Sequence, residues 1–356
     1  MNSRRRSWIF KNFLRATVCL LSPQMITAAV LEPYFRAPDP KVSFEARYPE
    51  QDNFPKFPWF FAGRKLSQQL TLAPLLEDIS TERLRQSVED LVKFNNRYYR
   101  SSTGRASLIA YAEKFKAIAK DRPDIEVILQ EHVSADAPRV QPSLIVRLKG
   151  RDALASEHIV VGTPADCINS VTGMANVNDP CPGADDNASG MAVILEAFRI
   201  LVENDIRPLR TLEFMAYAGE ELGLIGSHYV SESYRLEGTD VKAVLQLEGT
   251  MYPGAEPKIA LVSDFTHPEI SAFLGQLVTT YLDVPFVMSA CGYGCSDHAA
   301  WRQRGFPVGF PYSETIGKDN PYAHTPQDTI DRISFEHGKR FTRLTLAFLL
   351  ELAMHR

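Results

Sequence analysis

The sequence predicts an α/β fold with a mostly parallel central β-sheet that is covered by helices on both faces. Short apolar runs of β type alternate along the chain with segments whose apolar residues recur at helical spacing, which is typical of such sheets. The composition is that of a globular chain, with 45% hydrophobic and 23% charged residues among 356. Acidic residues follow several of the β-type runs, where ligands bind in this fold class.

The elements follow in chain order after a segment without periodicity. Residues 30–75 are rich in Pro and aromatic residues, and we interpret them as an N-terminal extension or pro-segment before the main domain at residues 76–356. The spacing of apolar residues predicts helices at Thr81–Phe94, Arg105–Ala119, Ser189–Val202, Ile225–Ser233, Pro268–Tyr281 and over the C-terminal stripe Phe341, Leu344, Phe348 and Leu352. Strands are expected at Ile125–Leu129, Ser143–Leu148, His158–Gly162, Leu212–Ala216, Val244–Leu247, Ile259–Val262 and Pro307–Phe310.

Residues 1–29 have the features of a signal peptide. They hold five basic residues and no acidic residue, and an apolar patch at Ala16–Leu21 precedes small residues at Thr27–Ala29. We therefore predict an exported protein, periplasmic or secreted; the alternative is a disordered basic tail. No later stretch has the roughly 18 apolar residues that a membrane span requires. The remaining chain has 34 basic and 43 acidic residues, a balance that disfavours nucleic acid as a partner.

The cysteines agree with export. Four of the five lie outside the proposed signal, namely Cys167, Cys181, Cys291 and Cys295. An even set in an exported protein suggests disulfides. Cys291 and Cys295 are close enough in sequence to bridge locally, and a bridge from Cys167 to Cys181 would hold the loop that precedes an acidic turn. Four free thiols are the alternative.

The residues after the β-type runs suggest a hydrolytic zinc site. The turn CPGADDNASG carries adjacent acids, and Glu220 and Glu221 follow the apolar run LEFMAYA. Acids at the ends of core elements lose hydration, which is costly unless a cation or a proton compensates. Hydrolysis of a peptide bond needs an activated water and a stabilised oxyanion, which a zinc ion supplies, and a separate carboxylate to accept a proton. A pair of neighbouring glutamates suits this division of roles.

Five segments together resemble a known family. PGADDNASG, FMAYAGEELGLIGS, LQLEGT, CGYGCSDHAAW and AHTPQDT are similar, in this order, to motifs of the bacterial secreted leucyl aminopeptidases with two co-catalytic zinc ions. The resemblance covers roughly residues 80–356. It implies a peptide substrate and Zn²⁺ as the cofactor.

The resemblance also implies roles for individual residues. Asp185 would bridge two zinc ions, Glu221 and His324 would complete the first site, and Glu248 would bind the second ion. Glu220 would be the general base. Tyr293, in the Cys291–Cys295 loop, would face the substrate carbonyl, and Gly183 and Gly190 would shape the acidic turn. Asp186 is expected to be a turn or helix-start residue, and Asp297 and His298 a helix cap and a supporting contact.

Two departures from the family pattern concern the second zinc. Pro164 occupies the position of a zinc-binding His, while Asp166 keeps the Asp two residues later, and Glu248 stands where the family has Asp. A proline side chain cannot bind zinc, so one firm site and a weakened second site are expected.

Three functions are therefore open. The first is an exported zinc exopeptidase, an aminopeptidase that removes apolar N-terminal residues. The second is a single-zinc acyl transferase similar to glutaminyl cyclases, and the third is a catalytically impaired binding homologue. Zinc content and substrate tests would separate the three.

Overall fold

The computed structural model describes residues 65–132, 140–172 and 176–355, all of which belong to one compact unit, Glu50–Arg356. The predicted signal peptide and residues 30–64 of the predicted extension lie outside the described residues. The helices are α5 (Gln69–Glu77), α6 (Thr81–Val92), α7 (Ser102–Ala119), α8 (Gly190–Glu203), α9 (Ile225–Glu237), α10 (Pro268–Tyr281), α11 (His298–Gln303) and α12 (Phe335–Ala353).

The strands form two sheets. Their bounds are β1 (Ile125–Gln130), β2 (Ser143–Leu148), β3 (Glu157–Pro164), β4 (Thr211–Tyr217), β5 (Asp240–Gln246), β6 (Ile259–Val262), β7 (Phe286–Ser289), β8 (Val308–Gly309) and β9 (Pro311–Tyr312). The central sheet has the order β1-β2-β4-β3-β5-β8, and β7-β6-β9 form a smaller sheet. In the central sheet β4, β3, β5 and β8 run parallel, and β2 is antiparallel to both of its neighbours.

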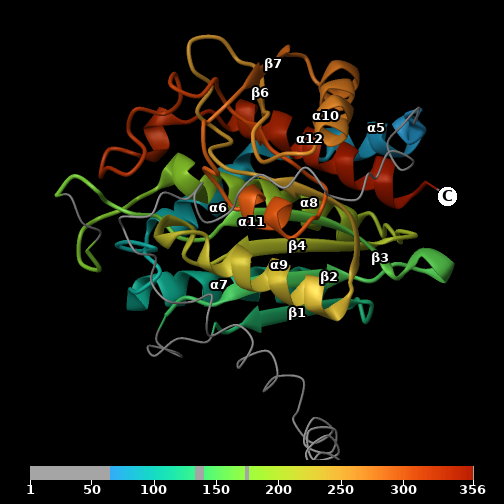
Figure 1. The fold of residues 1–356 in the computed structure, drawn as a ribbon, viewed down its shortest axis with the longest axis horizontal. Coiled ribbons are helices and arrows are strands. Elements are labelled where there is room, and N and C mark those ends of the chain that lie inside the picture. Colours follow the sequence, from blue (N-terminus) through green and yellow to red (C-terminus); the bar gives the residue numbers. More distant parts are fainter. Residues whose placement is uncertain (1–64, 133–139, 173–175, 356) are drawn as a thin grey trace, which may run out of the picture. The chain divides into compact units, whose positions relative to one another are not determined.

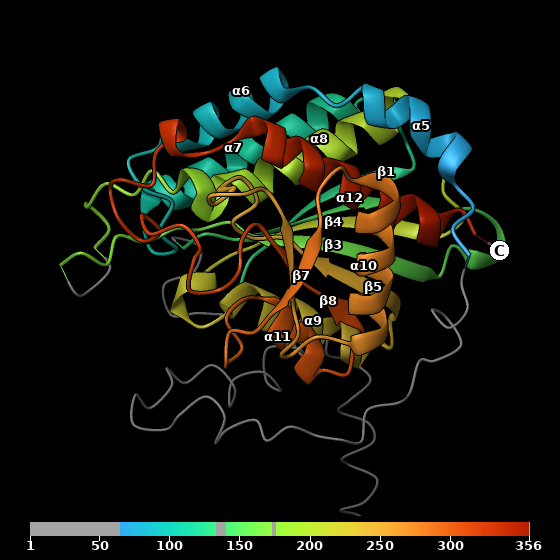
Figure 2. The ribbon, with the colours of Figure 1, turned by 90° about the horizontal axis from the view of Figure 1, so that it is seen from above.

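The mostly parallel sheet with helices on both faces is thus confirmed (Figure 1). Helices α6, α7, α8 and α12 cover one face, and α9 and α11 cover the other, as Figure 2 shows. Strands β3, β4 and β5 are buried over most of their length, as expected where helices cover both faces. The predicted strand Ile259–Val262 does form, but as the centre of the smaller sheet.

Helix α5 lies within and just beyond the segment predicted as an extension. Its side chains Leu72, Leu75 and Leu76 are buried in the main core, which also includes residues of α12. The carboxylate of Glu351 in α12 accepts hydrogen bonds from the backbone N–H of Ser67 and of Gln68. The packed domain therefore begins before residue 76.

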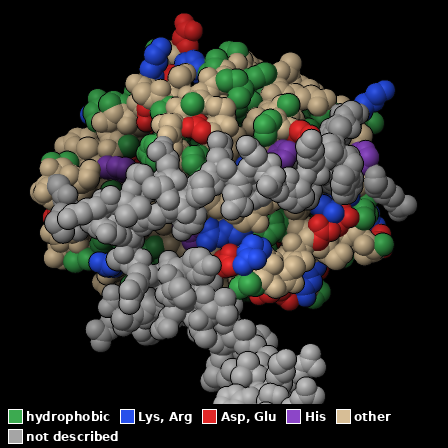
Figure 3. Space-filling view, viewed as in Figure 1, with side chains coloured by type: hydrophobic (Ala, Val, Ile, Leu, Met, Phe, Trp, Pro, Cys, Tyr) green, Lys and Arg blue, Asp and Glu red, His purple; other side chains and the backbone are tan. Residues whose placement is uncertain are grey.

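The surface carries charges of both signs. Figure 3 shows acidic and basic side chains interspersed on the face seen there. No helix within the described part of the chain combines the length and the apolar character that a membrane crossing requires.

Substitution of Leu72 tests whether α5 is part of the domain. Leu72 is fully buried, whereas Leu70 on the same helix is 92% exposed. Leu72→Ala leaves a cavity, so we expect the free energy of unfolding to fall by about 2–5 kcal/mol. The matched control Leu70→Ala should change it by less than about 0.5 kcal/mol. Denaturant unfolding measures both, and equal effects would show that α5 packs only loosely.

Candidate metal and catalytic site

The site lies where three central strands end at the same edge of the sheet. In the register of β3, Pro164 is opposite Tyr217 of β4, and Gly162 is opposite Gln246 of β5. The segments that follow these strands carry Asp166, the Glu220–Glu221 pair and Glu248. Glu221 and Glu248 therefore follow the carboxyl ends of strands as predicted, whereas Asp185 lies in the turn before α8.

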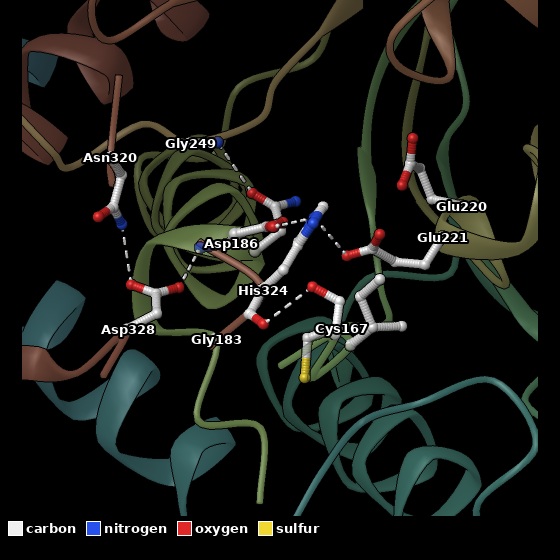
Figure 4. Close-up of polar contacts among 12 residues, drawn as sticks. Cys167, Gly183, Asp186, Glu220, Glu221, Gly249, Asn320, His324 and Asp328 are labelled. Carbon is white, nitrogen blue, oxygen red and sulfur yellow. Dashed lines mark hydrogen bonds and ion pairs between the residues drawn. The ribbon is translucent and has the colours of Figure 1, made fainter. Parts of the chain in front are cut away.

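Three side chains converge beside this edge. The Nε2 atom of His324 lies 3.0 Å from Oδ2 of Asp186 and 3.2 Å from Oε1 of Glu221 (Figure 4). One potential ligand atom from each residue lies within 4.8 Å of the other two. Within the described residues, no other group of three or more His, Cys, Asp or Glu side chains meets this distance. We call these residues the Asp186 triad.

The Asp186 triad has the chemistry of a zinc site. Ligand atoms of a tetrahedral zinc with bonds of about 2.1 Å lie roughly 3.4 Å apart, close to the two distances to the imidazole. The side chains of Asp186 and Glu221 are 14% and 7% exposed, while that of His324 is 45% exposed. Hydrogen bonds to the two carboxylates raise the pKa of His324 to about 11. A cation would therefore stabilise the two buried carboxylates, and the site is open to solvent at His324.

The sequence placed Asp185 in this role, and the structure does not. Oδ1 of Asp185 accepts the N–H groups of Met251 (2.8 Å) and Tyr252 (3.0 Å). Neighbouring side chains on the turn point in different directions, so the one that reaches His324 belongs to Asp186. Asp186 had been interpreted as a turn residue, because the sequence does not reveal which acid of an adjacent pair faces the site.

Asp328 holds both residues of the acidic turn and was missed by the sequence analysis. Its carboxylate accepts the N–H of Asp185 (3.1 Å) and of Asp186 (2.9 Å), and the side-chain amide of Asn320 donates to it (3.0 Å). Asp328 lies four residues after His324, within the AHTPQDT motif. Its acidic side chain in that motif was the only available signal, and it does not specify a backbone contact.

A buried arginine supports the acidic turn through backbone carbonyl groups. The guanidinium of Arg97 donates to the carbonyl oxygens of Pro182 (2.6 Å) and Gly183 (2.7 Å). Gly183 has φ +50°, and a Cβ there would lie 2.3 Å from the carbonyl oxygen of Asp186. A side chain at Gly190 would lie 2.3 Å from Oγ1 of Thr163. Both glycines are therefore required for the close packing of this turn.

Glu220 lies next to the Asp186 triad but points away from His324 (Figure 4). Its backbone N–H donates to Oδ1 of Asp166 at 2.9 Å. Burial raises the pKa of Glu220 well above its ordinary value, and the charges of Glu248 and Glu221 add to this. A carboxylate with a raised pKa is suited to accept a proton near neutral pH.

The region of the expected second zinc contains few ligands. Pro164 ends β3, and its carbonyl accepts a hydrogen bond from the side-chain amide of Asn187 at 3.0 Å. Oε2 of Glu248 is buried and has no hydrogen-bond partner in the described residues. Glu248 is not part of the Asp186 triad, and Oδ2 of Asp166 is likewise buried without a partner.

Tyr293 lies on the loop closed by one of two disulfides. Cys291 pairs with Cys295 and Cys167 pairs with Cys181, as predicted. Tyr293 is 56% exposed. Burial raises its pKa, and the charges of Glu248 and Glu220 raise it further, so the phenol is protonated at neutral pH.

Asp297 and His298 follow this loop and are both fully buried. Asp297 occupies the N-cap position of α11, but its side chain makes no capping hydrogen bond. Its carboxylate instead accepts a hydrogen bond from the hydroxyl of Ser227. The predicted capping role of Asp297 is therefore wrong, because the side chain is turned toward α9.

A carboxylate and imidazole site beside a raised-pKa glutamate, at the carboxyl edge of an α/β sheet, defines a metal-dependent hydrolase. The model of "Peptidase family M28" matches residues 143–349. The chain belongs to this family, and it is a metallopeptidase of the aminopeptidase-like hydrolases.

Individual relatives agree with the family assignment. "Leucine aminopeptidase 1" of Coccidioides posadasii is 35% identical over 303 residues, which is 81% of this chain and 75% of the relative. The crystal structure of the Legionella pneumophila LapA aminopeptidase is 30% identical with a TM-score of 0.75 and covers 82% of this chain and 76% of that one. A Bacteroides thetaiotaomicron glutaminyl cyclase, 15% identical, shares the fold with a TM-score of 0.60 and covers 78% of this chain and 98% of that one.

Matched substitutions of the two adjacent acids test which one binds the cation. Asp186→Asn removes one carboxylate ligand, so we expect at least a tenfold loss of zinc affinity, because even the loss of a group that only supports a ligand costs about 10–100-fold. Asp185→Asn keeps an oxygen for the N–H groups of Met251 and Tyr252 and should retain zinc. Zinc content after dialysis against a buffered chelator measures both, and the reverse order would restore Asp185 as the ligand.

Proposed function

We propose that this chain is an exported, single-zinc aminopeptidase that removes apolar N-terminal residues from peptides. The observation that carries the proposal is the Asp186 triad with Glu220 as the adjacent, separate carboxylate. The triad would hold the cation, and Glu220 is free to move a proton. This is the division of roles that hydrolysis of a peptide bond requires.

The proposal of one zinc rests on the ligands near Pro164. A second zinc ion could share the carboxylate of Asp186 but would need further ligands of its own. The family resemblance implies Glu248 as one of them. Pro164 has no side-chain donor, where the family has an imidazole. Three protein ligands with an open fourth position are a valid arrangement for a catalytic zinc.

The residues of the site would divide the reaction as follows. When bound, Zn²⁺ supplies Lewis acidity and lowers the pKa of water. Glu220 accepts the proton of the attacking water and passes it to the leaving amine. The phenol of Tyr293 donates a hydrogen bond to the carbonyl oxygen as negative charge develops there. Asp166 keeps Glu220 in place through the backbone N–H of Glu220.

Substrate and location rest on further observations. Preference for an apolar first residue is supported by the leucine aminopeptidases among the relatives. Export is supported by the basic and apolar features of residues 1–29 and by the two disulfides, which persist in oxidising compartments. The acidic balance of the remaining chain supports a peptide rather than a nucleic acid as the partner.

A glutaminyl-cyclase-like acyl transferase is the second candidate. The single triad of ligands favours this candidate, because the resemblance to glutaminyl cyclases implies an acyl transfer that uses one zinc ion. The overall fold does not separate the two candidates, since a glutaminyl cyclase shares it. The distinction lies in the nucleophile from which Glu220 accepts a proton. In hydrolysis it is water, and in cyclisation it is the α-amino nitrogen of the substrate, which attacks the side-chain amide carbonyl and releases ammonia.

Glu220→Gln tests the assigned base. We expect kcat for hydrolysis of leucyl-p-nitroanilide by the zinc-loaded enzyme to fall by about 10²–10⁴-fold, because the amide cannot accept the proton. Zinc content should stay at that of the unsubstituted chain. The matched control is Glu256→Gln, an exposed acid on the segment after β5, which should leave kcat unchanged.

Full activity in Glu220→Gln would remove Glu220 from the mechanism. Conversion of an N-terminal Gln peptide to its pyroglutamyl form by the unsubstituted enzyme, without hydrolysis of the anilide, would favour the second candidate instead.

Pro164→His tests the number of zinc ions. The new imidazole would lie at the end of β3, where the family has its ligand, so zinc content should rise from about one to about two per chain. Pro164→Ala is the control, since it removes the ring without adding a donor, and it should remain at one. Two zinc ions bound to the unsubstituted chain would contradict the single-zinc proposal.

A further inference from the structure

We infer that Asp264 is a positioning residue for the hydrolytic reaction, because its carboxylate fixes the disulfide loop that carries Tyr293. The inference rests on the proposed function, in which the phenol of Tyr293 contacts the substrate carbonyl. Asp264 lies two residues after β6, in a part of the chain to which the motifs assign no role. Its importance follows from what its carboxylate contacts.

The carboxylate of Asp264 accepts two consecutive backbone N–H groups. Its Oδ1 atom lies 3.1 Å from the nitrogen of Cys291, and its Oδ2 atom lies 2.5 Å from that of Gly292. One rigid carboxylate that binds two adjacent N–H groups sets both the position and the direction of the backbone. Tyr293 is the next residue, so its Cα is placed by this contact.

The pairing of β6 with β7 leads directly into this contact. The two strands are parallel, and after them the N–H of Ser263 donates to the carbonyl of Ser289 at 2.9 Å. Beyond this bond the two segments are no longer paired as strands. At Cys291 the backbone N–H donates to the side chain of Asp264 instead of to a strand carbonyl. Asp264 therefore continues the hydrogen bonding of the sheet into the loop.

The far end of the loop is held by a different strand. The Cys291–Cys295 disulfide closes the loop, and the side-chain amide of Gln246 in β5 donates to the hydroxyl of Ser296 at 3.0 Å. Gly292 has φ +82°, which a residue with a side chain rarely adopts. The disulfide fixes the size of the loop, but Asp264 connects its first half to the smaller sheet.

Tyr293 depends on its backbone for its position. The residue is more than half exposed, so packing restrains the ring only in part. Burial raises the pKa of its phenol, and the charges of Glu248 and Glu220 raise it further, so the hydroxyl stays protonated and can donate a hydrogen bond. A shift of the loop would therefore move the donor relative to the carbonyl that it serves, and such misplacement is costly in rate.

A buried imidazole lies near Asp264. His298 is fully buried, and its ring lies 4.7 Å from that of Phe310, centroid to centroid. Burial lowers the pKa of His298 to about 4, while the nearby Asp264 opposes this change. The imidazole near Asp264 is therefore neutral at neutral pH, so it does not compete with the two N–H groups for the carboxylate.

Asp264→Asn tests the inference. The amide oxygen can accept one of the two N–H groups, but its NH₂ group faces the other, so the loop should lose its fixed direction. We expect kcat for leucyl-p-nitroanilide to fall by about 10- to 100-fold, with KM changed by less than about threefold and zinc content unchanged. Asp283→Asn is the matched control, since Asp283 bonds the exposed side of Arg340, and it should leave kcat unchanged.

A double-mutant cycle separates positioning from general destabilisation. If Asp264 acts through Tyr293, Asp264→Asn should have almost no further effect on kcat in the Tyr293→Phe background. Losses that multiply in the double variant would overturn the inference, as would unchanged kcat in Asp264→Asn.

Hydrogen exchange gives a readout that does not need activity. Peptides covering residues 289–296 should exchange faster in Asp264→Asn, while the rest of the described chain keeps its protection. Unchanged exchange there would also overturn the inference. An unsubstituted, zinc-loaded enzyme that does not hydrolyse the anilide would instead refute the proposed function, and the exchange result would still decide whether Asp264 fixes the loop.

Discussion

The concentration of negative charge at one edge of the central sheet is the constraint on which the site depends. The carboxyl ends of β3, β4 and β5 bring Asp166, Glu220, Glu221 and Glu248 together, and the turn before α8 adds Asp186. Buried carboxylates repel one another and lose hydration. One imidazole and a more distant guanidinium offset this only in part. A bound cation would therefore stabilise this edge of the fold, and the candidate ligand atoms for it converge in the Asp186 triad.

The supports of the site come from separate parts of the fold. Arg97 and Asp328 hold the acidic turn through its backbone, and neither contacts the imidazole of His324. Asp166 holds Glu220 in the same indirect way. These side chains act on backbone carbonyl and N–H groups, so they fix the direction in which the functional side chains point. This explains why many buried polar side chains surround only a few candidate reacting groups.

The smaller sheet contributes what the central sheet cannot. The parallel strands end together, and the acids that follow them all approach the site from one side. Strands β6 and β7 lead to Asp264 and to the Tyr293 loop, which are joined by two hydrogen bonds. The loop that carries Tyr293 is thus positioned by the smaller sheet, whereas the acids are positioned by the central one.

Much of the fold and of the site could be predicted from the sequence, since apolar periodicity and local motifs carry that information. The buried strands of the central sheet and the long helices were placed within a few residues. Both disulfides followed from the number and spacing of the cysteines, and the pairing of Glu221 with His324 followed from the motifs. Strand β7 and helix α11 are short and lack a clear period, and α5 lies in a Pro-rich segment, so these elements were missed.

The sequence by itself determined that acids follow the strands and that a late histidine accompanies them. Only the tertiary structure decided that Asp186, and not Asp185, faces that histidine. The choice depends on the backbone of Met251 and Tyr252, which occupies one carboxylate and leaves the other free. These partners lie more than sixty residues away along the chain, and neither local periodicity nor a motif records which carboxylate they bind.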